Sequence, residues 1–351
     1  MIRVLKMGSA FIGIIVGAGF ASGNEIMTYF TSFGMAGIFG AVLCTALFAY
    51  LGMMLTRLGS RLQTKSHKDA IYKISGRYGG IIVDGVIIFT LFGVGVVMLA
   101  GAGANVNQQF GIPAFIGSLL MIALVFLTVL LNVDKVVSVI GSVTPFLILA
   151  VVGVSIYSLA TMDTTFAVLD PVAKAVPTTL PNWFISAINY VSFNIAVGAS
   201  MSIVMGGAES DEKTAAWGGL VGGLGLGILI ILSHLAIFSQ VDVVAGTELP
   251  MLAIIDNISP GLAVFMACIL YAMIFNTAVS MFYAFGSRFV RNDTNKFKLF
   301  VAVSLIIGYV LSFYGFTNLV SYLYPIVGYL GLFLVIALIV ASFRMPHARS
   351  K

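Results

Sequence analysis

Long runs of apolar residues constrain this chain more than any other feature. A helix needs about 20 mostly apolar residues to cross a bilayer, and a search for such runs gives ten candidate spans. In order, they cover residues 7–33, 35–56, 79–105, 112–131, 136–159, 183–208, 215–240, 260–289, 297–314 and 318–343. The sequence therefore predicts an all-α membrane protein with ten transmembrane helices.

The scarcity of charge excludes several classes of protein. Only 9% of the residues are charged, whereas a soluble domain carries about 25%. So few charged side chains cannot cover a water-facing surface, which excludes a soluble enzyme, a disordered chain and a nucleic-acid binder. The chain also lacks a Walker A sequence, a GxSxG elbow, a CxxC pair and a histidine cluster. We therefore expect no enzyme activity, no cofactor and no nucleic-acid partner.

The positive charges predict the orientation, because Lys and Arg collect in cytoplasmic loops. If the amino terminus is inside, every Lys and Arg except Lys174 falls in an inner segment. A miscounted span would scramble this segregation, so both termini are expected in the cytoplasm. Residues 1–21 also have the basic start and apolar run of a signal peptide, but removing them would place the following loops on the wrong sides.

An internal repeat relates the two halves of the chain. Residues 14–19 match residues 195–200, and the same shift of 181 positions carries each of the first five spans onto one of the last five. Because five is odd, the second copy enters the membrane from the opposite side. Inverted repeats with glycine-interrupted helices indicate a secondary transporter whose site lies at the midplane. We expect a first repeat over residues 1–160, an extracellular connector over 161–182, and a second repeat with a cytoplasmic tail over 183–351.

Glycines predict a break in the first span. Gly17, Gly19 and Gly23 each disfavour a continuous helix by about 1 kcal/mol relative to Ala, and a matching break is expected in the sixth span at residues 196–199. Free amides at residues 18–20 can hold an anionic group. Close helix packing is the alternative role of such glycines, and it is favoured for the cluster at residues 218–227 of the seventh span.

Polar residues beside the breaks are candidates for binding. Ser22 and Glu25 have capping-box spacing, which predicts an outer half-helix starting near Ser22. Glu25 is also the most deeply placed acid, and such an acid is a functional candidate. Asn276, Thr277 and Ser280 in the eighth span offer oxygen ligands for a hard cation, with hydrogen bonding between helices as an equally weighted alternative.

At these residues the chain resembles the amino acid–polyamine–organocation superfamily, which has a LeuT-type five-plus-five inverted fold. Most of its length is similar to the bacterial YkvI-like membrane proteins, and residues 17–25 carry the resemblance. The resemblance implies a multi-pass protein of the bacterial cytoplasmic membrane, a small-molecule substrate, contact with lipid, and a monomer or a homodimer. The residues expected to contact substrate are Val16, Gly17, Ala18, Gly19, Phe20, Phe193, Asn194, Ala196, Val197, Gly198, Ala199 and Ser200. A sodium ion is expected at Gly13, Val16, Asn276, Thr277 and Ser280.

These features together predict a cation-coupled secondary active transporter working by alternating access. Its substrate is expected to be a small organic solute, an amino acid or a related zwitterion. The coupling ion is Na⁺ or H⁺, with Glu25 as a further coupling residue. The rival prediction is a receptor subunit that keeps the transporter fold and its ligand site but moves nothing across the membrane.

Overall fold

The computed structural model describes residues 1–63, 67–130, 144–291 and 294–344, and every regular element within them is helical. The first half contains α1 (Ile2–Ile15), α2 (Ala18–Ser22), α3 (Asn24–Tyr29), the 3-10 turn η1 (Thr31–Phe33), α4 (Ala36–Leu62), α5 (His67–Phe110), α6 (Ala114–Leu130), α8 (Thr144–Ala160) and α9 (Phe166–Lys174). The second half contains α10 (Trp183–Gly207), α11 (Glu212–Ser239), α12 (Val241–Val244), α13 (Pro250–Ile258), α14 (Pro260–Phe289), α15 (Asn295–Ser312) and α16 (Phe316–Arg344).

Each expected span after the first coincides with one of these helices. Seven of the helices in the described residues are long and apolar enough to cross a membrane: α4, α5, α10, α11, α14, α15 and α16. α6 and α8 are shorter apolar helices, and the expected start of the fifth span, residues 136–143, lies outside the described residues. The predicted all-α membrane fold is confirmed.

Polar capping residues fix where several spans begin. The Asn182 side chain accepts a hydrogen bond from the Ile185 amide at the start of α10, and Asp211 accepts from two amides at the start of α11. Ser259 caps α14, whose first residue is a proline. These side chains satisfy amides that a helix start leaves without helical partners.

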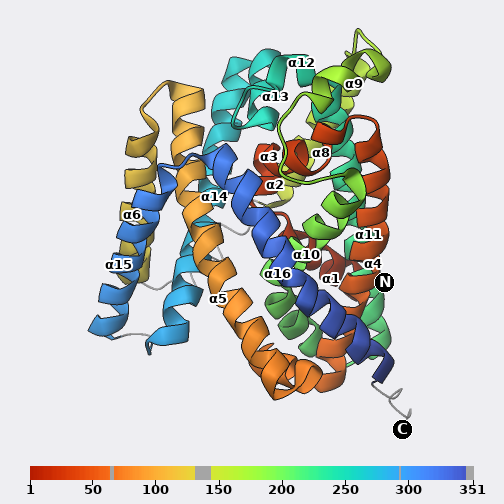
Figure 1. Cartoon of the computed structure of the whole chain (residues 1–351), viewed down its shortest axis with the longest axis vertical. Coiled ribbons are helices and arrows are strands. Elements are labelled where there is room, and N and C mark those ends of the chain that lie inside the picture. The colour runs from red at the N-terminus through yellow and green to blue at the C-terminus, as the bar shows by residue number, and fades with distance from the viewer. Residues whose placement is uncertain (64–66, 131–143, 292–293, 345–351) are drawn as a thin grey trace.

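Short helices cover one end of the bundle. α9, α12 and α13 lie at that end, whereas the end of α4, the start of α5 and the described carboxyl-terminal end of α16 lie at the other (Figure 1). Asp170 of α9 accepts a hydrogen bond from the Met35 amide at 2.8 Å and pairs with Lys174 at 2.6 Å. Hydrogen bonding from Lys174 and Met35 holds the pKa of the Asp170 carboxyl below its usual value, and the Met35 bond joins α9 to the start of α4.

Glycines let α11 approach α4 and α1 closely. A Cβ atom at Gly223 would lie 2.3 Å from the carbonyl oxygen of Phe48, and one at Gly218 would lie 2.7 Å from the Met7 side chain. The glycine cluster at residues 218–227 therefore includes close-packing positions, as small residues do in membrane helix interfaces.

Ion pairs gather at the end of the bundle opposite α9, α12 and α13. Glu212 at the start of α11 accepts hydrogen bonds from Arg57 at 2.5 Å and Arg61 at 2.6 Å, both on α4. Arg288 of α14 pairs with Asp84 of α5 at 2.6 Å. These pairs link neighbouring helices on the side where the sequence places most of the positive charge.

Candidate functional site

The first span is interrupted near its middle. α1 ends at Ile15, after which the Val16 amide donates a hydrogen bond to the Ile12 carbonyl at 2.7 Å. Val16 and Gly17 are extended, and α2 begins at Ala18. A helix end leaves its last carbonyls, and a helix start its first amides, without helical partners. Free carbonyl groups at the end of α1 and free amides at the start of α2 are therefore separated only by Val16 and Gly17.

A second interruption occurs at Gly23, whose φ of 82° lies in the left-handed region that glycine adopts without strain. The Ser22 hydroxyl donates to the Gly19 carbonyl at 2.7 Å and accepts from the Asn24 amide at 3.2 Å. The expected capping box is wrong, because the turn at Gly23 moves Ser22 away from the position that precedes α3. Glu25 is left free to point elsewhere.

A cavity with a volume of about 350 Å³ surrounds the first interruption. Its walls come from the break itself and from α5, α10, α14 and α16. Among the residues expected at the site, those that line it are Gly13, Val16, Gly17, Ala18, Gly19, Glu25, Phe193, Asn194, Val197, Asn276, Thr277 and Ser280. The structure thus brings the expected parts of the first, sixth and eighth spans to one cavity.

The break expected in the sixth span is wrong, because α10 runs as one helix from Trp183 to Gly207. The expected break at residues 196–199 contains one glycine, Gly198, whereas residues 17–23 of the first span contain three, and packing outweighs the modest penalty of a single Gly. A continuous helix turns only one face to the cavity. Phe193, Asn194 and Val197 lie on that face.

Several expected substrate contacts lie outside the lining of this cavity: Phe20, Ala196, Gly198, Ala199 and Ser200. Gly198 packs on the end of α1, since a Cβ atom there would lie 2.5 Å from Ile15 Cδ1. Ala196 faces α16, where a Cβ atom at Gly331 would lie 3.1 Å from it. Their places follow from the unbroken helical turn of α10, which directs these residues toward neighbouring helices.

Glu25 is buried at the cavity wall, with only 5% of its surface exposed. Its Oε2 accepts a hydrogen bond from the Tyr190 hydroxyl at 3.2 Å. Its Oε1 lies over Gly19, so closely that a Cβ atom on Gly19 would be 1.9 Å from it. The absence of a side chain at Gly19 therefore makes room for the carboxyl group.

The polar groups of α14 face the same cavity. The Thr277 hydroxyl donates to the Met273 carbonyl at 3.0 Å, and the Ser280 hydroxyl donates to the Asn276 carbonyl at 2.9 Å. The side-chain oxygen of Asn276 is buried and has no hydrogen-bond partner in the described part of the chain. A buried acceptor without a donor is costly, so this oxygen is suited to a ligand donor or a cation.

Sequence reasoning missed Tyr190 and most of the apolar wall. Tyr324 of α16 lines the cavity and stacks on Phe193, with ring centroids 4.2 Å apart. Four methionines also line it: Met98, Met201, Met273 and Met281. A tyrosine deep in an apolar span needs a partner for its hydroxyl, which could have singled out Tyr190, whereas nothing in the sequence separates these methionines from lipid-facing ones.

Hydrogen bonds close the bundle above the cavity, on the side of α12 and α13. The Asn24 amide group donates to the Glu248 carbonyl at 2.8 Å and to Thr317 at 3.0 Å. Gln108 of α5 exchanges two hydrogen bonds with the Leu249 backbone. The cavity instead extends toward the other end, where Met201, which lines it, is 62% exposed.

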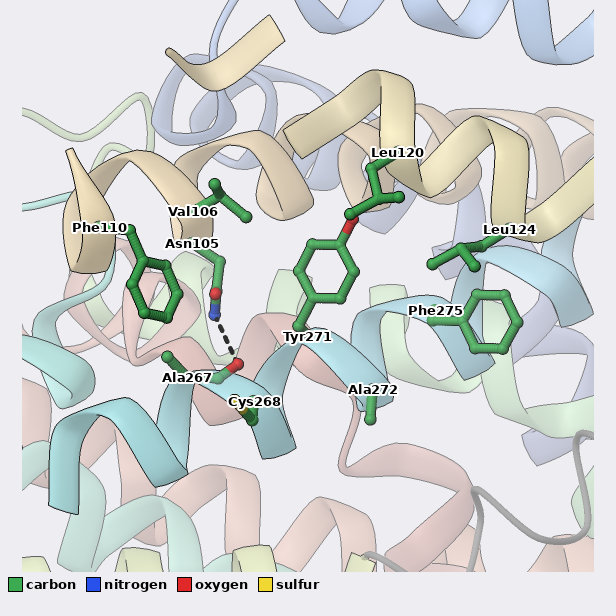
Figure 2. A pocket seen from close by; sticks show the side chains of 10 residues that line it. All are labelled: Asn105, Val106, Phe110, Leu120, Leu124, Ala267, Cys268, Tyr271, Ala272 and Phe275. Atoms are coloured by element: carbon green, nitrogen blue, oxygen red, sulfur yellow. Dashed lines mark hydrogen bonds between the residues drawn. The ribbon is translucent and has the colours of Figure 1, made fainter. Parts of the chain in front are cut away.

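A second cavity of about 380 Å³ lies between α5, α6 and α14. Figure 2 shows its lining, which is almost entirely apolar. Asn105 donates to the Ala267 carbonyl at 3.3 Å, and Tyr271 donates to the Gly117 carbonyl at 2.9 Å. Because the polar groups in its wall are already bonded to the protein, this cavity is a weaker candidate for a polar solute.

No family model matches the chain. The membrane protein YkvI of Bacillus subtilis, whose function is uncharacterized, is 28% identical over 348 residues, which is 98% of this chain and 97% of that protein. The resemblance to YkvI-like membrane proteins is confirmed. This similarity covers the break, the cavity and nearly every helix.

Solved structures of transporters share the fold. An inward-facing conformation of Mhp1 matches 99% of this chain and 80% of that chain, with a TM-score of 0.67 and 15% identity. MhsT in complex with L-phenylalanine matches 97% and 88%, with a TM-score of 0.59 and 18% identity. A Na⁺-coupled sialic acid symporter matches 96% and 86%, with a TM-score of 0.51 and 13% identity. The chain therefore has the LeuT-type fold, and these neighbours are transporters rather than enzymes.

Proposed function

We propose that this protein is a cation-coupled secondary transporter of a small organic solute, which it moves by alternating access. The observation that carries the proposal is the cavity at the interruption of the first span, inside a fold shared with transporters. Irregular backbone at membrane depth is tolerated only where it is buried in protein or lines a wet cavity. Here it does line a cavity, at the position where inverted-repeat transporters place their substrates.

The proposed substrate is an amino acid or a related zwitterion. A volume of about 350 Å³ lies in the range of small-molecule pockets. The extended backbone at Val16 and Gly17, the start of α2 at Ala18, and the Asn194 side chain supply polar contacts beside an apolar wall. The complex of MhsT with L-phenylalanine supports this class.

The proposed coupling ion is Na⁺ or H⁺. The unpartnered Asn276 oxygen, the Thr277 and Ser280 hydroxyls and the backbone at the end of α1 supply oxygen atoms to the lining of the same cavity. Oxygen ligands suit a hard cation, and the Na⁺-coupled sialic acid symporter supports sodium. Glu25 is the proposed carrier if the ion is a proton.

The proposed topology has ten spans arranged as two inverted repeats, over residues 1–160 and 183–351. The connector at residues 161–182 contains α9 and lies outside the cell. Both termini lie in the cytoplasm of a bacterium, because the Lys and Arg residues gather at that end. The ion pairs of Arg57, Arg61 and Arg288 support this orientation.

Uptake into proteoliposomes tests the function. We expect saturable uptake of a radiolabelled amino acid from a mixture when a Na⁺ or H⁺ gradient is imposed, and no uptake when the gradient is collapsed. Gly17→Val should abolish uptake, since its branched side chain would project into the cavity. Binding of the same solutes without flux under every gradient would instead support the receptor subunit, and normal transport by Gly17→Val would contradict the assigned site.

A further inference from the structure

The charge balance of the cavity is one-sided. Among the described residues, Glu25 is the one acid that lines it, and no Lys, Arg or His does. The titratable groups that interact with the carboxyl are phenols: Tyr190 on α10, Tyr29 on α3 itself and Tyr324 on α16. His234 of α11, which also packs against α3, bonds to Thr31 instead, at 3.1 Å. α5 contributes apolar side chains, and α14 contributes neutral polar or apolar ones. Within the described residues, therefore, no protein cation neutralises this carboxylate.

One of the two oxygens of the Glu25 carboxyl group has no hydrogen-bond donor among the described residues. Tyr190 donates to Oε2 at 3.2 Å, and no hydrogen bond from the described residues reaches Oε1. Oε1 lies over the bare backbone of Gly19 at the cavity wall. A ligand that enters the cavity can thus reach this oxygen directly, because Gly19 has no side chain to shield it.

The rest of the wall suits the body of an organic cation. Phe193 and Tyr324 stack on each other at the lining, and aromatic faces attract cations. Met98 and Met273 bring flexible, polarizable side chains that adapt to apolar groups of different shape. A largely apolar wall that carries one carboxylate among neutral polar groups matches a molecule that has one charged nitrogen and a hydrophobic tail.

We propose that Glu25 is the counter-ion of a positively charged nitrogen on the bound solute and thereby the residue that selects solutes by charge. The inference rests on the proposed function, since it assumes that solutes bind in this cavity. It deepens that function by naming the recognised group as an ammonium, carried either by an amine or by an amino acid. A solute ammonium and a proton then compete for the same carboxylate, and the proton that Glu25 loses on binding passes to the water of the cavity.

A series of ligands with the same phenyl tail tests the inference. The probes are 2-phenylethylamine, its neutral analogue 2-phenylethanol, the anion 3-phenylpropanoate and the zwitterion L-phenylalanine. Binding to the full-length purified protein is measured by calorimetry and by thermal shift, since a ligand of the native state raises apparent stability. We expect the amine to bind more tightly than the alcohol and the alcohol more tightly than the anion.

Glu25→Gln should weaken amine binding about 10- to 100-fold, as expected for losing a hydrogen bond to a charged group, and should leave the alcohol within about twofold. Asp163→Asn is the matched control, because it removes a carboxylate from an exposed connector position and should change neither. In the wild-type protein, amine affinity should fall as the pH is lowered, while alcohol affinity should stay constant. This pH series needs no variant, so it still tests whether protons and the amine compete for Glu25 if Glu25→Gln fails to fold.

Three results would overturn the inference: no binding of the amine to the wild-type protein, equal affinity of the amine and the alcohol, or unchanged amine affinity in a folded Glu25→Gln variant. Equal affinity would mean that Glu25 is held in its protonated, neutral form. Failure of the proposed function would look different, because then no solute would be taken up under any gradient, whatever its charge.

Discussion

Replacing Gly19 with alanine gives a sharp test of how the cavity is built. The added Cβ atom would lie 1.9 Å from Glu25 Oε1 and 2.8 Å from its Cδ, so the two groups cannot both keep their places. The obstructing atoms are the far end of a flexible side chain, which can rotate away. We therefore expect a folded protein in which the Glu25 carboxyl has moved.

The expected magnitude follows from what that movement breaks. The hydrogen bond from Tyr190 would be lost, which amounts to about 0.5–1.5 kcal/mol for a neutral acceptor and about 1.5–3 kcal/mol for a charged one. An alanine in α2 recovers roughly 0.5–1 kcal/mol of helix propensity. The net change in the free energy of unfolding should thus lie between a rise of about 0.5 kcal/mol and a fall of about 2.5 kcal/mol, while affinity for a cationic solute falls about tenfold or more.

Gly17→Ala is the matched control for Gly19→Ala. Gly17 also lines the cavity, its backbone is extended, and a Cβ atom there would meet nothing within 4 Å. Thermal unfolding and calorimetric binding of 2-phenylethylamine to both variants and the wild-type protein provide the comparison. If Gly19→Ala binds the amine as tightly as Gly17→Ala does, the position of Glu25 does not depend on the bare backbone at Gly19 and the reasoning fails.

Three further predictions concern helix packing and the two ends of the bundle. Gly223→Ala should lower the free energy of unfolding by about 1–3 kcal/mol, because its Cβ atom would meet Phe48 backbone at 2.3 Å; Gly225→Ala, which would meet only the tip of the Ile12 side chain, should be milder in the same thermal assay. Burial raises the pKa of the Glu248 carboxyl, so its protonated form stabilises the fold, and this contribution is lost as the pH rises from 4.5 through the raised pKa. Glu248→Gln should flatten the pH dependence of apparent stability in this window. An unchanged slope would contradict a role of Glu248 in this pH dependence. Arg61→Ala should destabilise the protein more than Arg57→Ala, since the Arg61 side chain is 14% exposed against 37% for Arg57, and equal unfolding midpoints would show that burial does not matter at this ion pair.

The sequence predicted the helices of this fold closely, because apolar runs of membrane length have few other solutions. The eighth expected span, Pro260–Phe289, coincides with α14 to the residue, since Ser259 and Pro260 mark its start. The short helices α9, α12 and α13 were not predicted. They lie in the connections between spans, and in that setting helix formation depends on contacts with other parts of the chain.

Only part of the candidate site was predicted from the sequence. Backbone at Val16 to Gly19 and the α14 residues Asn276, Thr277 and Ser280 do line one cavity, because glycine spacing and polar residues in an apolar span are visible in a sequence. The predicted break in the sixth span is wrong, because helix packing there outweighs the effect of Gly198. The bond between Tyr190 and Glu25 could not be predicted, since it depends on how α3 turns after Gly23.

If the cavity at the interruption opens alternately to the two sides of the membrane, a single thiol in its wall becomes accessible from each side in turn. Met98→Cys would put a thiol in the cavity wall in place of a larger side chain, in a background with Cys268→Ser, because Cys268 is exposed whereas Cys44 is buried. Oriented proteoliposomes are treated with a membrane-impermeant maleimide applied to one side at a time, with and without an ion gradient and a transported solute. We expect labelling from either side, a shift between sides when the gradient is reversed, and protection by the solute. Labelling from one side only, under every condition, would contradict alternating access.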